Sequence, residues 1–199
     1  MSLVVLIAGG TASGKTTIAK AFSTQNQNCV LIHHDRYYKD IPHPRGYNFD
    51  EPAALDSAHL ANDIQNLKKG NSADLPVYDF SKHARSNQTE RIESKPIILV
   101  EGILVMAAPE LYPLADLCVF VDAPDDIRLI RRIRRDVVER GRDVEGVMKQ
   151  YIQTVRPMHQ LHVQPCKDKA SLHLDGLAPI EESVQKLQNS IQKRLSESL

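Results

Sequence analysis

The chain has 199 residues, 42% of them hydrophobic, and its 25 lysines and arginines balance its 25 aspartates and glutamates. This length predicts about one domain with a substantial core, and the neutral charge argues against a general affinity for nucleic acid or membranes. No apolar run approaches the roughly 18 residues of a membrane span, and no basic segment precedes the first apolar run. We therefore expect neither a span nor a signal peptide, and a cytoplasmic location. The three scattered cysteines lack metal-ligand spacing and fit a reducing compartment.

The first motif lies between an apolar run at residues 3–8 and a predicted helix that starts near Thr16. It reads GGTASGKT and fits the pattern G-x-x-x-x-G-K-[ST] of a phosphate-binding P-loop. Strand, glycine loop and helix form the context that this pattern requires, because backbone N–H groups and the helix N-terminus together attract phosphate. We expect nucleoside triphosphate binding by Gly9, Gly10, Thr11, Ala12, Ser13, Gly14, Lys15, Thr16 and Thr17.

Further apolar runs alternate with helical patterns along the chain. Strands are predicted at 29–32, 97–100 and 117–121, with a weaker candidate at 171–174, and helices at 52–69, 125–140, 143–159 and 179–195. This alternation predicts an α/β fold, a three-layer P-loop NTPase with a parallel sheet flanked by helices. Candidate strands at 75–80 and 88–92 interrupt the alternation, and we interpret them as a β-hairpin inserted over the active site.

Two carboxylates lie at the ends of predicted strands: Asp35 lies just past the second, and Glu101 follows the third directly. In parallel sheets ligands bind at the carboxyl ends of the strands, so both side chains are expected beside the P-loop. Asp35 is the candidate base for an acceptor hydroxyl. Thr16, Glu101 and Asp35 are the candidate ligands of Mg²⁺. The alternative for each carboxylate is an ordinary turn or capping residue.

Seven arginines lie between residues 128 and 142. Leu129, Ile130 and Ile133 form an apolar stripe among them, and no aromatic residues interleave for base stacking, so nucleic-acid binding is not expected. A lid over residues of about 128–150, whose arginines close on a triphosphate, and a solvated basic face remain the two interpretations. The eight histidines show no zinc-site spacing, and we expect no zinc site.

These motifs together resemble the uridine kinase (uridine–cytidine kinase) family of P-loop kinases. The specific segments are NFDEPAALD at 48–56, PVYDF at 76–80, EGIL at 101–104, and RRD to ERGRD at 134–143. The resemblance covers residues 3 to about 168. It implies a single kinase domain over 1–199, with a nucleoside-binding insertion at about 37–92. It also implies phosphoryl transfer from ATP or GTP, with Mg²⁺, to the 5′-hydroxyl of uridine and cytidine in pyrimidine salvage, by a homo-oligomer, typically a tetramer.

The resemblance also assigns roles to matching residues. Lys15, Asp35 and Arg135 would be catalytic, and Arg140 would join the ATP site. Asp50 would accept hydrogen bonds from the ribose 2′- and 3′-hydroxyls, and His83 would read uracil or cytosine, because a neutral imidazole both donates and accepts. The remaining nucleoside contacts would be Tyr38, Phe49, Tyr78, Phe80, Ile103, Arg132, Arg142 and Gln150.

Two segments depart from the family pattern. The connection from Tyr38 to Asn48 is short and carries Pro42 and Pro44, and residues 169–175 replace the usual Tyr-Ala-Asp and apolar strand. Two other functions stay open at this point. One is a kinase of another small alcohol, similar to phosphoribulokinase or pantothenate kinase. The other is a non-catalytic nucleotide-binding regulator, although the chain lacks the N-K-x-D motif of GTPase switches.

Overall fold

The computed structural model describes residues 2–41, 46–80 and 82–197. Its centre is a five-stranded sheet in the order β2-β5-β1-β6-β7, in which every neighbouring pair runs parallel. The strands are β1 (Leu3–Gly9), β2 (Cys29–His33), β5 (Ile97–Glu101), β6 (Leu117–Asp122) and β7 (Leu172–Asp175). All four predicted strands and the weaker candidate are therefore confirmed. The carboxyl end of β1 leads into the glycine loop.

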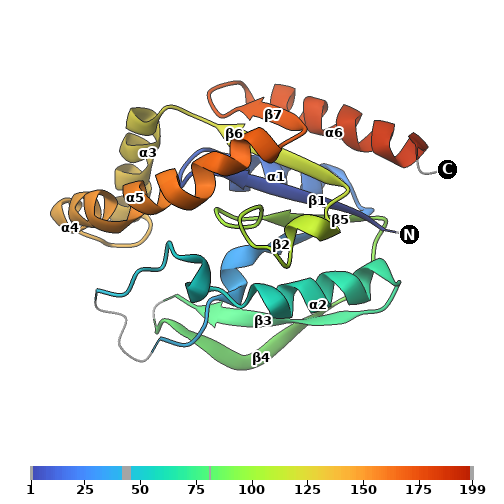
Figure 1. Ribbon diagram of the computed structural model, residues 1–199, viewed down its shortest axis with the longest axis horizontal. Helices are drawn as coiled ribbons and strands as arrows, with labels where there is room; N and C mark the ends of the chain where they lie inside the picture. Colours follow the sequence, from blue (N-terminus) through green and yellow to red (C-terminus); the bar gives the residue numbers. More distant parts are fainter. Residues whose placement is uncertain (1, 42–45, 81, 198–199) are drawn as a thin grey trace.

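The sheet is apolar on both faces because helices cover both (Figure 1). In β1, Leu3, Val5 and Ile7 pack in one core with α1 (Lys15–Gln25) and α6 (Ile180–Glu197). The alternate residues of β1 pack in a second core with α2 (Ser57–Lys68). This two-sided burial explains why the strands read as continuous apolar runs rather than as alternating ones. The predicted three-layer α/β fold is confirmed.

The second core gives a stability prediction. Phe120 in β6 is 1% exposed and lies in this core, on the face of the sheet that α2 covers. We expect Phe120→Ala to lower the free energy of unfolding by about 3–5 kcal/mol, since lost burial and a residual cavity add together. Leu161, which is 61% exposed, is the matched control, and Leu161→Ala should cost less than about 1 kcal/mol. Urea unfolding followed by circular dichroism measures both, and equal losses would contradict the packing described.

The inserted hairpin forms a separate two-stranded antiparallel sheet of β3 (Ala73–Asp79) and β4 (Ala84–Ile92). Figure 1 shows it beside α2. The predicted hairpin is confirmed, but β4 begins at Ala84 rather than at 88, and a register shift interrupts the pairing between Pro76 and Tyr78. Pro42 and Pro44 lie outside the described residues.

Two helices begin or end differently from the sequence prediction. The helix expected over 52–69 is a 3-10 turn at Pro52–Ala54 followed by α2 from Ser57, because the Asp56 side chain caps α2 by accepting from the His59 N–H at 3.1 Å. The helix expected over 143–159 starts as α4 (Val144–Gln150) and continues through wide π-type turns and the short α5 (Arg156–Met158) to Val163. Pro157 lies in this stretch and cannot donate a backbone hydrogen bond.

The arginine-rich helix α3 (Asp125–Val138) buries a charged face. Its buried residues are Arg128, Arg132 and Asp136, whereas Ile130 is 63% exposed. Of the apolar stripe noted in the sequence, Leu129 and Ile133 are half-buried and Ile130 is exposed. The physical reason is that α3 faces a polar cleft rather than a hydrophobic core. No helix among the described residues is long and apolar enough to cross a membrane.

Candidate active site

A cleft of about 940 Å³ opens at the carboxyl ends of the parallel strands. It collects nearly all of the site residues predicted from sequence, drawn from the loop before α1, the ends of β2 and β5, the hairpin, and α3 with α4. The predicted residues that line it are Thr11, Ala12, Gly14, Lys15, Thr16, Thr17, Asp35, Tyr38, Phe49, Asp50, Tyr78, Phe80, His83, Glu101, Ile103, Arg132, Arg135, Arg140, Arg142 and Gln150.

Three predicted ATP-binding residues, Gly9, Gly10 and Ser13, do not line the cleft. Ser13 is fully buried, and a Cβ atom added to Gly10 would collide with the guanidinium of Arg128. Arg128 is itself buried, donates to the Ala123 carbonyl at 3.1 Å and pairs with Asp125. The loop therefore rests on a buried arginine, and these three residues shape its underside.

The glycine loop presents its backbone to the cleft in a strained conformation. Gly14 has φ +102°, and Ala12 has φ +58°, in the left-handed region that non-glycine residues rarely adopt. Gly14 is also the N-cap of α1 and brings no side chain to cap it, so the first N–H groups of the helix remain available to an anion. Lys15, Thr16 and Thr17 follow at the start of this helix. This arrangement suits phosphate binding.

Glu101 is the polar centre beside the loop. It is 2% exposed, accepts a hydrogen bond from Thr16 Oγ1 at 3.0 Å, and lies 4.0 Å from Lys15 Nζ and 2.7 Å from His33 Nδ1. Burial alone would raise the pKa of Glu101, but His33, Lys15 and Thr16 together hold it below its ordinary value. Glu101 is therefore an anion at neutral pH.

Asp35 lies next to Glu101, and its pKa is shifted in the opposite direction. Burial and the negative charge of Glu101 raise the pKa of Asp35, and Lys15 opposes this shift. One oxygen or nitrogen atom from each of His33, Asp35 and Glu101 lies within 4.8 Å of the others, a geometry that can hold a metal ion. Neighbouring carboxylates with pKa values pushed apart are typical of sites in which one accepts a proton and the other stays charged.

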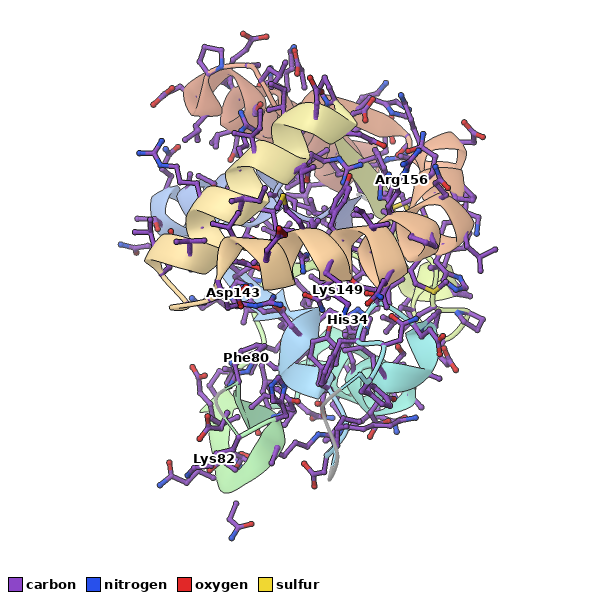
Figure 2. The ribbon with its side chains drawn as sticks, turned by 90° about the vertical axis from the view of Figure 1, so that its left-hand side faces the viewer. His34, Phe80, Lys82, Asp143, Lys149 and Arg156 are labelled. Carbon is purple, nitrogen blue, oxygen red and sulfur yellow. The ribbon has the colours of Figure 1, made fainter. Side chains whose placement is uncertain are left out.

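The opposite end of the cleft is aromatic. Ring centroids lie 5.6 Å apart for Tyr38 and Tyr78, 5.7 Å for Tyr38 and Phe49, and 4.9 Å for Phe49 and His83. Phe80 packs on Tyr78 at 5.0 Å yet is 56% exposed. Figure 2 shows Phe80 on the hairpin, below α4, which carries Lys149 and is capped by Asp143. The rings form a slot that a flat heterocycle could enter.

Between the two ends lies a buried polar group centred on Arg132. Its guanidinium donates to Thr11 Oγ1 and to Gln150 Oε1, both at 3.0 Å. Asp50, 9% exposed, receives a hydrogen bond from Thr154 Oγ1 at 3.4 Å. Burial raises the pKa of Asp50, while Arg132 and Thr154 oppose the shift. Asp50 thus places its carboxyl group in the cleft near Arg132.

Comparison with known proteins agrees with this geometry. The "Phosphoribulokinase / Uridine kinase family" profile matches residues 4–179. The chain belongs to this family. A protein named uridine kinase from Chloroflexus aurantiacus is 46% identical over 181 residues, which cover 87% of each chain. Another uridine kinase, from Lactococcus lactis subsp. cremoris, is 40% identical over 178 residues and 86% of each chain. The phosphoribulokinase structure from Rhodobacter spheroides, 14% identical, has a TM-score of 0.63 over 87% of this chain and 70% of that chain, and so shares the fold.

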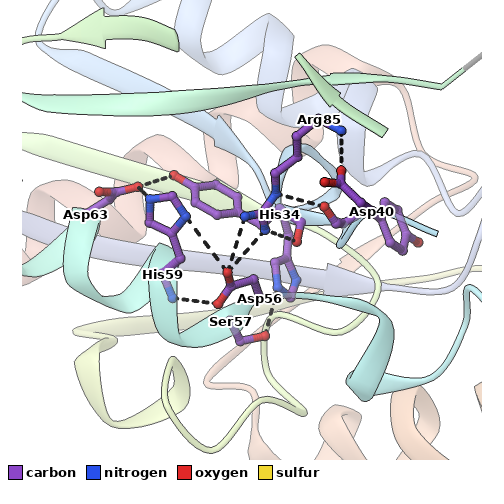
Figure 3. A network of polar contacts seen from close by, with 9 residues as sticks. His34, Asp40, Asp56, Ser57, His59, Asp63 and Arg85 are labelled. Atoms are coloured by element: carbon purple, nitrogen blue, oxygen red, sulfur yellow. Dashed lines mark hydrogen bonds and ion pairs between the residues drawn. The ribbon is translucent and has the colours of Figure 1, made fainter. Parts of the chain in front are cut away.

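In this family member, the hairpin is anchored by Arg85 of β4 (Figure 3). Its guanidinium donates to the carbonyls of Tyr37 and Tyr38, both at 3.0 Å, and pairs with Asp56 at 3.3 Å. The backbone N–H of Arg85 donates to Asp40 Oδ1 at 2.6 Å. These bonds join the hairpin to the segment that carries Asp35 and Tyr38. Sequence reasoning did not single out Arg85, because nothing in its local pattern shows a contact 47 residues away.

Two further groups of cleft residues were missed. His33 is the register partner of Glu101 across β2 and β5, and only the pairing of these strands reveals it. The segment from the end of β7 to the start of α6 lines the cleft beside the P-loop through Asp175, Gly176, Ala178 and Ile180, and Arg131 donates to the Gly176 carbonyl at 2.9 Å. The weakly predicted strand at 171–174 was the available signal, since the carboxyl end of any strand in this sheet meets the same edge.

Proposed function

We propose that this member of the family is an ATP-dependent kinase that phosphorylates the 5′-hydroxyl of uridine, and also of cytidine, to give UMP and CMP in pyrimidine salvage. The observation that carries the proposal is the position of Asp35. An oxygen of its carboxyl group lies within 4.8 Å of Glu101 on the phosphate side, and Asp35 lines the same cleft as Lys15 and the aromatic Tyr38. The relatives named uridine kinase, at 40–46% identity, support this substrate.

The phosphate half of the cleft has the groups that phosphoryl transfer requires. Lys15 and the loop N–H groups would bind the β- and γ-phosphates, and Arg135 and Arg140 would neutralise the charge that moves. The oxygens of Thr16, Glu101 and Asp35 fit the preference of Mg²⁺ for hard ligands, and Mg²⁺ bound there would shield the transferred phosphate. Asp35 would accept the proton of the attacking hydroxyl.

The other half would hold the nucleoside. Asp50 would accept hydrogen bonds from the ribose 2′- and 3′-hydroxyls, since a carboxylate has two acceptor oxygens for a vicinal diol. Arg132, Arg142 and Gln150 would border the ribose. The base would lie among Tyr38, Phe49, Tyr78, Phe80, His83 and Ile103. The Tyr78 hydroxyl is buried without a hydrogen-bond partner among the described residues and is available to a ligand.

Three accompanying expectations stay predictions: ATP or GTP as the donor, a tetramer of a single-domain chain, and a cytoplasmic location. Release of ADP with Mg-ATP tests the proposal when uridine, cytidine, thymidine, adenosine, pantothenate and ribulose 5-phosphate are compared. We expect strong turnover with uridine and cytidine and weak turnover with thymidine, which lacks the 2′-hydroxyl. Turnover with pantothenate or ribulose 5-phosphate alone would replace the proposed substrate, and no turnover at all would favour a regulator.

Base selection is predicted to depend on His83. Its φ of +51° is unusual for a residue with a side chain and directs the ring against Phe49, 4.9 Å away. A neutral imidazole can pair with either uracil or cytosine, so His83→Ala should lower kcat/KM and change the uridine-to-cytidine ratio by about threefold or more. His83→Gly removes the ring without backbone strain and should behave alike.

Steady-state kinetics with both nucleosides measure this change. Lys82→Ala is the matched control, because the Lys82 side chain is 77% exposed and pairs only with Asp79 in the structure described. An unchanged nucleoside ratio in both His83 variants would contradict the role given to the imidazole.

A further inference from the structure

One buried carboxylate holds the arginines of the α3–α4 region together. Asp136 is completely buried, at 0% exposure. Its Oδ1 accepts from Arg135 Nε at 2.9 Å and lies 3.4 Å from Arg140 NH1. Its Oδ2 lies 3.2 Å from Arg142 NH1 and 3.7 Å from Arg132 Nε. Four guanidiniums therefore converge on one anion.

The arginines extend outward from this centre toward the cleft. The exposed fraction of the side chain rises from 8% for Arg132 to 29% for Arg135, 35% for Arg142 and 52% for Arg140. All four line the cleft, whereas Asp136 does not. Each guanidinium has five N–H donors, and Asp136 engages only one or two of them. Arg132 also donates to Thr11 and Gln150, whereas Arg135, Arg140 and Arg142 keep most of their donors available to a ligand in the structure described.

The cluster carries an excess of positive charge. Four cations surround one buried anion, so the five residues of the cluster carry a net charge of +3, before Asp50 and Glu139, which also line the cleft, are counted. Asp136 also fixes the backbone there, because its carbonyl accepts from the Arg142 N–H at 3.0 Å and so closes the turn between α3 and α4. Without a central anion, guanidiniums this close would repel one another and separate.

We propose that Asp136 is a positioning residue that preorganises these arginines for a polyphosphate. It would hold them in the cleft before the ligand arrives, so that binding costs little side-chain entropy and the triphosphate meets aligned donors. The inference rests on the proposed function only in taking ATP as the ligand. The alternative role is competition, in which Asp136 occupies guanidinium N–H donors that phosphate would otherwise use.

The two roles predict opposite results for Asp136→Asn, a nearly isosteric change that removes the charge. If Asp136 positions the arginines, the substitution should lower the affinity for the non-hydrolysable imido analogue of ATP by about tenfold or more. The affinity for AMP should fall by less than about threefold, since AMP lacks the β- and γ-phosphates. Competition would strengthen binding of the analogue. Titration calorimetry without any acceptor measures both affinities, so a failure of the uridine proposal leaves this test intact.

Asp126→Asn is the matched control, because Asp126 is an exposed carboxylate in the first turn of the same helix. It should leave both affinities unchanged. Circular dichroism establishes that each variant is folded. If Asp136→Asn does not fold, Asp136→Glu retains the charge but displaces the arginines by one methylene, and the same selective loss for the ATP analogue is expected.

A double-mutant cycle separates positioning from general damage. Arg140→Gln should weaken binding of the ATP analogue to the wild-type protein. In the Asp136→Asn or Asp136→Glu variant, the same substitution should change the binding free energy by less than about half as much. Independent effects of the two substitutions, or unchanged or tighter binding of the analogue in the Asp136 variants, would overturn the proposal.

Discussion

Asp35→Asn is expected to lower kcat with uridine by about 100- to 10,000-fold, the range typical of a lost general base. The amide keeps the size of the carboxylate but cannot accept the proton of the 5′-hydroxyl. Asp35 lies next to the buried Glu101 and lines the same cleft as Lys15 and Tyr38. Steady-state release of ADP measures the change.

The pH dependence gives a second measurement of the same group. The pKa of Asp35 is raised in the free enzyme by burial and by Glu101, and the base works only when ionised. Wild-type kcat/KM should therefore fall as the pH drops through this raised pKa, and the residual activity of Asp35→Asn should lack that fall. Asp74→Asn, an exposed carboxylate paired with Arg91 on the hairpin, is the control. Comparable kcat values for Asp35→Asn and the wild type would exclude Asp35 as the base.

The parts of the fold and site that the sequence predicted are those fixed by local pattern. The glycine loop has a fixed spacing, and a strand buried on both faces reads as a continuous apolar run, so both could be located directly. Asp35 and Glu101 followed from one further rule, that strand ends in a parallel sheet share an edge. For these residues, the location in the fold follows directly from the location in the sequence.

Helix α3 shows why the rest could not be predicted. Its apolar residues form a stripe in the sequence pattern, yet Arg128, Arg132 and Asp136, four residues apart, form the buried face. A buried charged face is stable only where partners are supplied, and here they come from Asp125, Thr11, Gln150 and neighbouring arginines. Because Thr11 lies 121 residues away from Arg132, the periodicity of the helix does not indicate that the two side chains are in contact.

The second large effect is expected for Glu101→Gln. Its carboxylate is held by Thr16 and His33 and faces Lys15, and its pKa is below the ordinary value, so it is charged at neutral pH. We expect kcat at low Mg²⁺ to fall by about 100-fold or more, since a neutral amide is a poorer ligand for a hard dication. Part of the loss should be recovered at high Mg²⁺, because weakened binding responds to concentration.

Glu101→Gln also changes Asp35, which separates a metal-binding role from simple damage. The charge of Glu101 is the second cause, after burial, of the raised pKa of Asp35, so removing that charge should lower this pKa and move the acidic fall in kcat/KM to lower pH. Glu90→Gln is the control, because Glu90 pairs with Arg36 at 2.8 Å but is 60% exposed and does not line the cleft. A loss of kcat that no Mg²⁺ concentration relieves, with an unmoved pH profile, would show that Glu101 neither holds the metal nor acts on the base. A relieved loss with a shifted profile would place both carboxylates in one electrostatic unit, in which the charge that attracts Mg²⁺ also tunes the proton acceptor.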